Sequence, residues 1–180
     1  LDAWTQEERA HYELGGARAS AVVEPATNYF VGRLARDIGS SGAIGGMVTA
    51  TQRSDGAGLL LHDEAYTAGI DGYHYFGNRD YIFDWGVFGS QVSGSAAAIE
   101  STQRSPGHYF QRPDADYLDF DPSRTSLSGW GANAYFEKQT GKWRYAAGGN
   151  VGSPELEIND IGFRTRVDAI SSSFAAGWVD

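Results

Sequence analysis

Large apolar residues alternate with small or polar residues in a run near the middle of the chain. The odd positions of this run are all apolar or aromatic: Tyr81, Phe83, Trp85 and Val87. The even positions include Asp84 and Gly86. Side chains on a β-strand point alternately to its two faces. The run therefore predicts a strand with one broad apolar face and one small, mixed face.

The same alternation predicts further strands along the chain. We expect them at about 1–5, 28–37, 43–53, 65–76, 81–93, 130–137, 143–150 and 163–180. The connections between them alternate in length: 6–26 is long, 39–42 short, 54–63 medium, 77–80 short, 94–127 long, 140–142 short and 152–161 medium. Membrane barrels have short turns on the periplasmic side and longer loops outside.

This alternation of short and longer connections favours an all-β fold, an antiparallel transmembrane β-barrel segment of about seven or eight strands. Its short turns would lie on one side and its long loops on the other. A soluble antiparallel barrel or sandwich also alternates apolar and polar residues, and it is the alternative.

Composition narrows the function classes. The chain of 180 residues is expected to form a single domain over 1–180, with a long outer loop at about 94–127. The formal charge of -9 argues against nucleic-acid binding, which needs a basic surface. The absence of cysteine excludes disulfides and thiolate metal ligands. The chain begins at Leu1 and shows no signal-peptide pattern, so we expect a processed piece or a fragment of a larger barrel.

Five sequence strings carry a family resemblance. They are EPATNYFVGRL (24–34), AYTAGID (65–71), YFQRPDA (109–115), RTSLSG (124–129) and SPELEINDIGF (153–163). In this order they resemble a bacterial family of outer-membrane β-barrel proteins of unknown function. Longer members of that family begin with a domain resembling the family 9 carbohydrate-binding modules. The resemblance implies a middle slice of the barrel, set in outer-membrane lipid, with a carbohydrate as a candidate ligand and no established catalytic residues.

The long loop holds the candidate ligand-binding residues Tyr109, Phe110, Gln111, Arg112 and Asp114. Aromatic rings can stack on a sugar, and Arg can form paired hydrogen bonds to hydroxyl or anionic groups. Alternatively, the aromatic pair pins the loop into the barrel mouth, and we favour this second interpretation. The five Trp residues invite a similar sugar-stacking hypothesis, but a position at the membrane interface is the stronger expectation.

Charged residues in the predicted strands are expected to face the lumen. They are Arg33, Asp71, Asp84, Glu137, Arg144, Arg164, Arg166 and Asp168. An Arg on the lipid face at mid-depth costs ~2–4 kcal/mol, which favours the inward orientation. These side chains could line a solute pathway, or they could pair across strands and fill the interior.

Enzymatic signatures are absent from the sequence. No nucleophile elbow, phosphate-binding loop or zinc-protease helix motif occurs. The acidic cluster at Asp114, Asp116, Asp119 and Asp121 lacks the EF-hand pattern, so we expect no metal and no cofactor. We predict a non-enzymatic barrel within a larger protein linked to carbohydrate binding or uptake. The barrel anchor of a glycoside-active enzyme, or a soluble all-β binding module, are the alternatives.

Overall fold

A computed structural model describes residues 1–54 and 57–180 and is built almost entirely of β-strands. The strands are β1 (Asp2–Thr5), β2 (Glu8–Leu14), β3 (Ala17–Glu24), β4 (Thr27–Ile38), β5 (Gly42–Arg53), β6 (Glu64–Phe76), β7 (Tyr81–Ser93), β8 (Ser126–Lys138), β9 (Trp143–Gly152) and β10 (Ala169–Trp178). The helical elements are the short 3-10 turn η1 (Ala57–Leu59) and α1 (Ala96–Arg104). In the described part of the chain, no helix is both long and apolar enough to cross a membrane.

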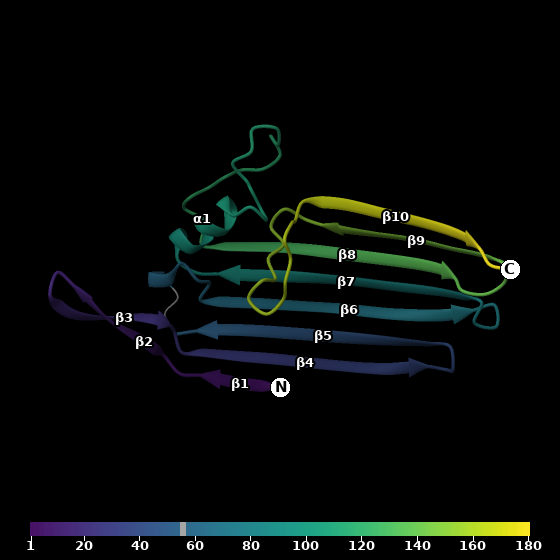
Figure 1. The fold of residues 1–180 in the computed structure, drawn as a ribbon, viewed down its shortest axis with the longest axis horizontal. Helices are drawn as coiled ribbons and strands as arrows, with labels where there is room; N and C mark the ends of the chain where they lie inside the picture. Colours follow the sequence, from purple (N-terminus) through teal and green to yellow (C-terminus); the bar gives the residue numbers. More distant parts are fainter. Residues whose placement is uncertain (55–56) are drawn as a thin grey trace.

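Eight strands form one antiparallel sheet in the order β1-β4-β5-β6-β7-β8-β9-β10 (Figure 1). Strands β2 and β3 form a separate two-stranded hairpin that extends beyond one end of the sheet. The predicted all-β class and antiparallel arrangement are confirmed. Within the described residues the sheet stays open, because β1 and β10 do not pair with each other.

Two stretches differ from the sequence predictions. The predicted loop at 6–26 contains the β2–β3 hairpin, and the predicted loop at 94–127 contains α1. The last strand, expected from Phe163, begins only at Ala169, so residues 163–168 are a connection. In the predicted loop at 54–63, residues 55 and 56 lie outside the described residues.

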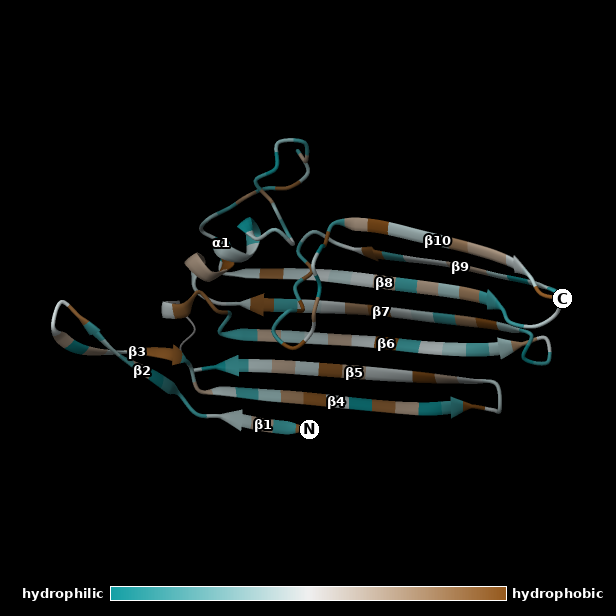
Figure 2. Cartoon of the chain, in the orientation of Figure 1, coloured by the Kyte–Doolittle hydropathy of each residue, from teal (hydrophilic) through white to brown (hydrophobic). Residues whose placement is uncertain are grey.

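The register of the sheet sorts its side chains into two faces. One face carries Phe30, Val48, Ile70, Val87 and Trp130, and we name it the apolar face. The opposite face carries residues such as Thr51, Thr67, Ser90, Gly129 and Asn133, and we name it the covered face. Figure 2 shows the alternation as bands of opposite hydropathy along each strand.

The buried core lies on the covered face. Ala65, Val92 and Leu127 from three neighbouring strands pack with Ile99 of α1 and Phe110 of the following loop. Helix α1 begins where the Ser95 side chain accepts a hydrogen bond from the Ala98 nitrogen, as N-cap residues do. The helix and its loop therefore close over the end of the sheet that carries the longer connections.

A second segment lies across the same face. Residues 153–168, which we name the crossing segment, leave β9 and run over the middle of the sheet before β10 begins (Figure 1). The Glu157 nitrogen donates a hydrogen bond of 3.0 Å to the Ser90 hydroxyl of β7. Together the crossing segment and α1 give the covered face its name.

Candidate functional site

The backbone of the crossing segment contacts the sheet at a glycine, Gly129 of β8. A Cβ atom at Gly129 of β8 would lie 2.2 Å from the Leu156 nitrogen and 2.3 Å from its Cα. Such distances leave no room for any side chain. Leu156 is 0% exposed, which marks this contact as the centre of the segment's attachment. Gly129 therefore lets the backbone of the segment touch the backbone of the sheet.

An ionic cluster holds the segment farther along. Asp160 accepts a hydrogen bond of 2.6 Å from Arg53 of β5, and its second oxygen lies 2.8 Å from His62 Nδ1. The three side chains are about nine-tenths buried. A buried carboxylate is tolerated when it is paired and hydrogen-bonded, and Asp160 meets both conditions. We name Arg53, His62 and Asp160 the latch.

The latch also reaches α1. His62 Nε2 lies 2.8 Å from the Thr102 hydroxyl, and that hydroxyl donates to the Ala98 carbonyl at 3.2 Å. A carboxylate, an imidazole and a hydroxyl in this order also occur in nucleophile-activating triads. Here the hydroxyl is already bonded to its own helix, so we assign the chain of contacts a structural role. It joins β5, α1 and the crossing segment.

The latch changes the ionisation of its carboxylate. Burial alone would raise the pKa of Asp160, but the hydrogen bonds and charges of His62 and Arg53 outweigh this effect. The pKa of Asp160 therefore lies below its ordinary value, and the group remains charged at neutral pH. This charge keeps the pairing with Arg53 intact.

A second histidine meets the segment on the other side of Leu156. His108 Nε2 lies 3.2 Å from the Leu156 carbonyl and 3.7 Å from the Glu157 carboxylate, and Nδ1 lies 3.2 Å from the Ser105 hydroxyl. Burial lowers the pKa of His108 below its ordinary value, although the Glu157 charge opposes this shift. The neutral imidazole, donating from Nε2, suits the carbonyl it faces.

The end of the crossing segment is fixed by a further contact. Asp168 forms an ion pair with Arg112, and its carboxylate accepts a hydrogen bond of 2.6 Å from the Tyr117 hydroxyl. Arg112 also donates to the Tyr117 hydroxyl at 2.8 Å. These contacts join the long loop to the residue just before β10.

This arrangement corrects the strand assignment of three residues that were expected to face the lumen, while their lumen-facing orientation stays a prediction. Arg164, Arg166 and Asp168 lie in the crossing segment and not in a strand, because pairing with β9 starts at Ala169. The Arg164 nitrogen donates to the Asn159 side chain at 2.6 Å, and its guanidinium donates to the Arg166 carbonyl at 2.9 Å. Local hydrogen bonds within the segment replace the expected sheet ladder there.

The five candidate ligand residues of the long loop have different surroundings. Phe110 is 2% exposed within the core, and Arg112 is committed to Asp168. Tyr109 is exposed, with a left-handed φ of 49°, and Asp114 is exposed as well. The Gln111 amide donates to the Arg104 carbonyl at 3.3 Å. For Phe110 the structure matches the favoured pinning role, while ligand binding by the others stays a prediction.

The other five strand charges share the covered face: Arg33, Asp71, Asp84, Glu137 and Arg144. Arg33 of β4 and Asp71 of β6 form a two-pronged ion pair at 2.6 and 2.7 Å. The pair reaches across Gly45 of β5, where a Cβ atom would lie 2.9 Å from the guanidinium. Pairing across strands, one of the two roles considered for these residues, is therefore present for Arg33 and Asp71.

A cavity of about 300 Å³ lies between the sheet and the crossing segment. Arg33, Asp71 and Asn133 line its polar side, and Ile158 and Ile161 of the segment line its apolar side. The cavity is at the lower end of the size range of ligand pockets. It has both polar and aliphatic walls.

The apolar face has the opposite character. One row across it, from β4 to β10, reads Leu34, Gly46, Ile70, Val87, Ala132, Val151 and Ile170. The adjacent row, from β4 to β8, reads Gly32, Val48, Ala68, Gly89 and Trp130. Neither of these rows of described residues contains a charge, yet Leu34 is 84% and Ile170 is 85% exposed. Monomeric soluble proteins rarely expose an apolar patch of this extent.

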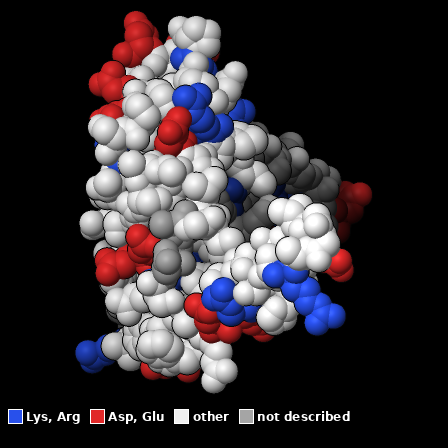
Figure 3. Space-filling view, turned by 90° about the vertical axis from the view of Figure 1, so that its left-hand side faces the viewer, with Lys and Arg blue, Asp and Glu red and all other residues white. Residues whose placement is uncertain are grey.

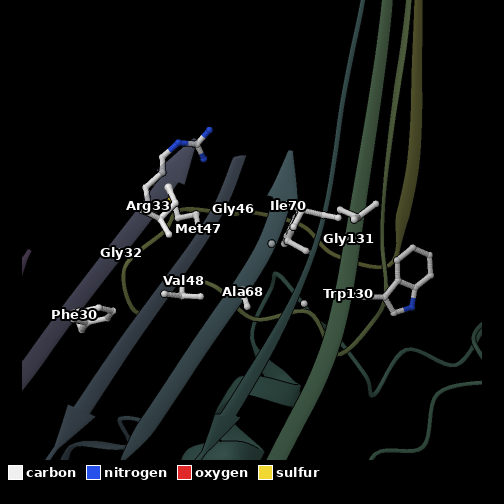
Figure 4. A pocket seen from close by; sticks show the side chains of 15 residues that line it. Phe30, Gly32, Arg33, Gly46, Met47, Val48, Ala68, Ile70, Trp130 and Gly131 are labelled. Atoms are coloured by element: carbon white, nitrogen blue, oxygen red, sulfur yellow. The ribbon is translucent and has the colours of Figure 1, made fainter. Parts of the chain in front are cut away.

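A hollow of about 1000 Å³ lies in these rows (Figure 4). Figure 4 shows Phe30 and Trp130 at its two sides and Val48 between them. Gly32, Gly46 and Ala68 form a low floor because their side chains are small. The hollow is therefore apolar and broad.

Aromatic rings gather where the apolar face meets the short turns. Phe76, Tyr81 and Phe136 pack with ring centroids 5.3 to 6.0 Å apart, and Tyr145 lies 6.1 Å from Phe136. Trp143 and Trp178 meet edge to face at 5.1 Å. At the opposite end, which carries the longer connections, Figure 3 shows separate groups of basic and acidic side chains among uncharged ones.

No group of three or more His, Cys, Asp or Glu side chains suited to a metal occurs within 1–54 and 57–180. In the acidic cluster of the long loop, Asp121 accepts hydrogen bonds from the backbone nitrogen and the hydroxyl of Ser123. These bonds lower the pKa of Asp121 and stabilise a local turn at Asp121–Pro122.

Sequence reasoning missed the latch, the Gly129 contact and the role of His108. His62 and Asp160 are 98 positions apart, so no local pattern links them. No protein-family model, no curated protein and no solved structure matches this chain. The resemblance to the outer-membrane barrel family stays a prediction.

Proposed function

We propose that this sheet is part of a β-barrel that spans a bacterial outer membrane, with its apolar face toward lipid. The single observation that carries the proposal is the charge-free pair of rows on a face whose large apolar side chains are exposed. In water such a surface would favour aggregation, whereas hydrocarbon is a suitable solvent for it.

Strand length and aromatic placement agree with this orientation. Strands β6, β7 and β8 each have 13 residues, and about 9–11 tilted residues suffice to cross a bilayer. The rings around Phe76, Tyr81 and Trp143 lie beside the short turns, as an interfacial aromatic girdle would. The short turns would then face the periplasm and the charged loops the exterior.

The covered face would line the lumen, and the crossing segment would act as its plug. The latch, the Gly129 contact and the Asp168 ion pair hold this plug at three places. A lumen filled in this way favours solute capture at the loops over free passage through an open pore. The proposed link to carbohydrate binding or uptake rests on the family resemblance, and the polar wall at Arg33, Asp71 and Asn133 is compatible with it.

The absence of cysteine makes a direct test simple. A single cysteine at Val87 or at Asn133, labelled with a bimane fluorophore, reports on the two faces separately. In vesicles that contain lipids with a spin-labelled acyl chain, we expect strong quenching at position 87 and little at position 133. A chain that stays in the aqueous phase with no quenching at 87 would favour the soluble binding module. Equal quenching at both positions would contradict the face assignment.

A further inference from the structure

The hydroxyl of Thr51 is buried on the covered face without a hydrogen-bond partner among the described residues. Thr51 lies in β5 beside the crossing segment and is 0% exposed. A buried hydroxyl that makes no hydrogen bond is costly, and such groups usually bond to protein or to an ordered water. The Thr51 hydroxyl is therefore expected to have a partner in the space beside it.

Thr51 borders a cavity of about 10 Å³. The sheet contributes the hydroxyl-bearing residues Thr49, Thr51 and Thr67, and the crossing segment contributes Glu157 and Asp160. The cavity thus lies between the latch carboxylate and the carboxylate that faces His108. Ala65, Ile158 and Ile161 also line the cavity, so its walls are mixed, but polar groups from both the sheet and the segment reach it, unlike the dry cavities of apolar cores.

We propose that this cavity is a binding site for one water molecule, which bridges the Thr51 hydroxyl to the crossing segment. The volume is that of about one water-sized sphere, and a buried water needs two to four polar partners. Three threonines and two carboxylates can supply them. The water satisfies the Thr51 hydroxyl and adds a second polar contact between β5 and the segment, beside the Arg53–Asp160 hydrogen bond.

A cation fits the same cavity less well. Calcium takes about six to eight oxygen ligands at about 2.3–2.6 Å, which a space of this size does not allow. Both oxygens of Asp160 are already engaged, one by Arg53 and the other by His62. One oxygen of Glu157 accepts a hydrogen bond of 2.6 Å from the Asn159 nitrogen. A water molecule, which is uncharged and can both donate and accept hydrogen bonds, therefore suits the site better than a cation.

The water makes the attachment of the segment depend on the Thr51 hydroxyl, which makes no direct hydrogen bond to the segment. Removal of the Thr51 hydroxyl should loosen the segment if the water is present, because the water loses a partner. The same change should tighten the segment if no water is bound, because an unsatisfied polar atom disappears. The sign of the effect decides between the two cases.

The experiment uses Leu156→Cys as a reporter in the otherwise cysteine-free protein. Its thiol reacts only when the segment opens, because position 156 is fully buried. We expect Thr51→Val to raise the labelling rate roughly five-fold, and Thr51→Ser, which keeps the hydroxyl, to leave it close to the parent rate. An unchanged or slower rate in Thr51→Val would overturn the proposal.

Two further measurements keep the test independent of the variant's folding. In the unmodified protein, an experimental density map should contain a single peak within hydrogen-bonding distance of the Thr51 hydroxyl, and an empty site would overturn the proposal. The labelling rate should not change when sodium is exchanged for potassium or when a calcium chelator is added. A dependence on either would assign the site to a cation instead. Neither measurement depends on which face meets lipid, so the proposed function can fail separately.

Discussion

The two faces of this sheet have opposite relations between chemistry and burial. On the apolar face, Leu34, Val48, Ile70 and Val87 are large, uncharged and exposed. On the covered face, polar or small residues such as Thr51 and Ser90 are buried beneath α1 and the crossing segment. In a water-soluble sheet with one packed face, the apolar residues would be the covered ones.

This difference indicates where each face obtains its stability. The covered face is held by specific contacts, including one ionic latch, one backbone contact at Gly129 and a small core around Phe110. The apolar face offers no comparable set of polar contacts, so its stability would come from its solvent. A substitution on the covered face should therefore disturb the contacts next to it. A substitution on the apolar face should instead change how the sheet interacts with its solvent.

The largest effect is expected at the latch. Asp160→Asn leaves Arg53 buried without a full counter-charge, and breaking a buried ion pair costs about 3–5 kcal/mol. The free energy of opening, measured from labelling of Leu156→Cys, should fall by an amount of this order. Asp114→Asn, at an exposed loop carboxylate, is the control and should have no effect. A loss of lipid quenching at position 87 would mean that the two faces are coupled.

A charge on the apolar face should have the next largest effect. Val87→Arg places a cation in a charge-free row, at a cost of ~2–4 kcal/mol if the row lies in hydrocarbon. The measurement is the fraction of protein that assembles in vesicles in a protease-resistant form. Asp84→Asn changes the net charge by the same amount on the covered face of the same strand and should assemble normally. Equal tolerance of both would remove the distinction between the faces.

A methyl group at Gly129 tests the backbone contact. Gly129→Ala should displace Leu156 and cost about 1–3 kcal/mol, the usual range for overpacking. Labelling at position 156 should accelerate accordingly. Gly89→Ala, on the apolar face, is the matched control, since its added Cβ would lie no closer than 3.5 Å to another atom. Similar behaviour of the two variants would show that the segment is not held at Gly129.

Mild acid should loosen the covered face through His108. Its pKa in the closed state lies below the ordinary 6.5, so the open state takes up a proton that the closed state does not. Closure should weaken as the pH falls below about 6.5, by at most ~1.4 kcal/mol per pH unit, until the lowered pKa is reached. Asp160 has a lowered pKa as well, so its contribution persists to lower pH and is lost only as the pH falls through that pKa.

The measurement is the labelling rate at position 156 relative to Phe163→Cys, a reporter in the same segment at a position where the native Phe163 is 86% exposed. The ratio corrects for the pH dependence of thiol chemistry. His108→Gln should flatten the profile between pH 7 and 5, since the glutamine does not titrate. A profile that is unchanged in His108→Gln would assign the effect to another group.

The smallest effect is expected at Arg33 and Asp71. Both side chains are nearly half exposed in the open sheet, and exposed ion pairs contribute little to stability. Arg33→Gln should leave the thermal midpoint almost unchanged, with Asp71→Asn as the matching variant. A clear loss of stability would show that further protein covers the pair and excludes water from it.

The period-two pattern predicted most of the sheet because one face of each strand is distinct. Strand β7, predicted and found at residues 81–93, carries the pattern from Tyr81 to Val87. The β2–β3 hairpin was missed since almost all of its residues are exposed, which leaves no face to produce an alternation. The run of three alanines after Ser95 is a helix signal that could have located α1.

The candidate site was less predictable because it depends on long-range contacts. Arg53, His62 and Asp160 come from three separate stretches, and their meeting follows from the path of the crossing segment. Gly129 looks like any other strand glycine in the sequence, and only the approach of Leu156 reveals its role. Phe110 was placed among the candidate ligand residues, with pinning of the loop into the barrel mouth as the favoured alternative, and in the structure it is 2% exposed in the small core.

The order of the sheet has a consequence for how it can be completed. Every neighbouring pair from β1 to β10 is antiparallel, and the sheet contains eight strands, so its two edge strands run in opposite directions. An antiparallel closure joining these edges therefore requires an even number of additional strands, counting zero as even. Parity thus rules out a wholly antiparallel cylinder with an odd number of strands.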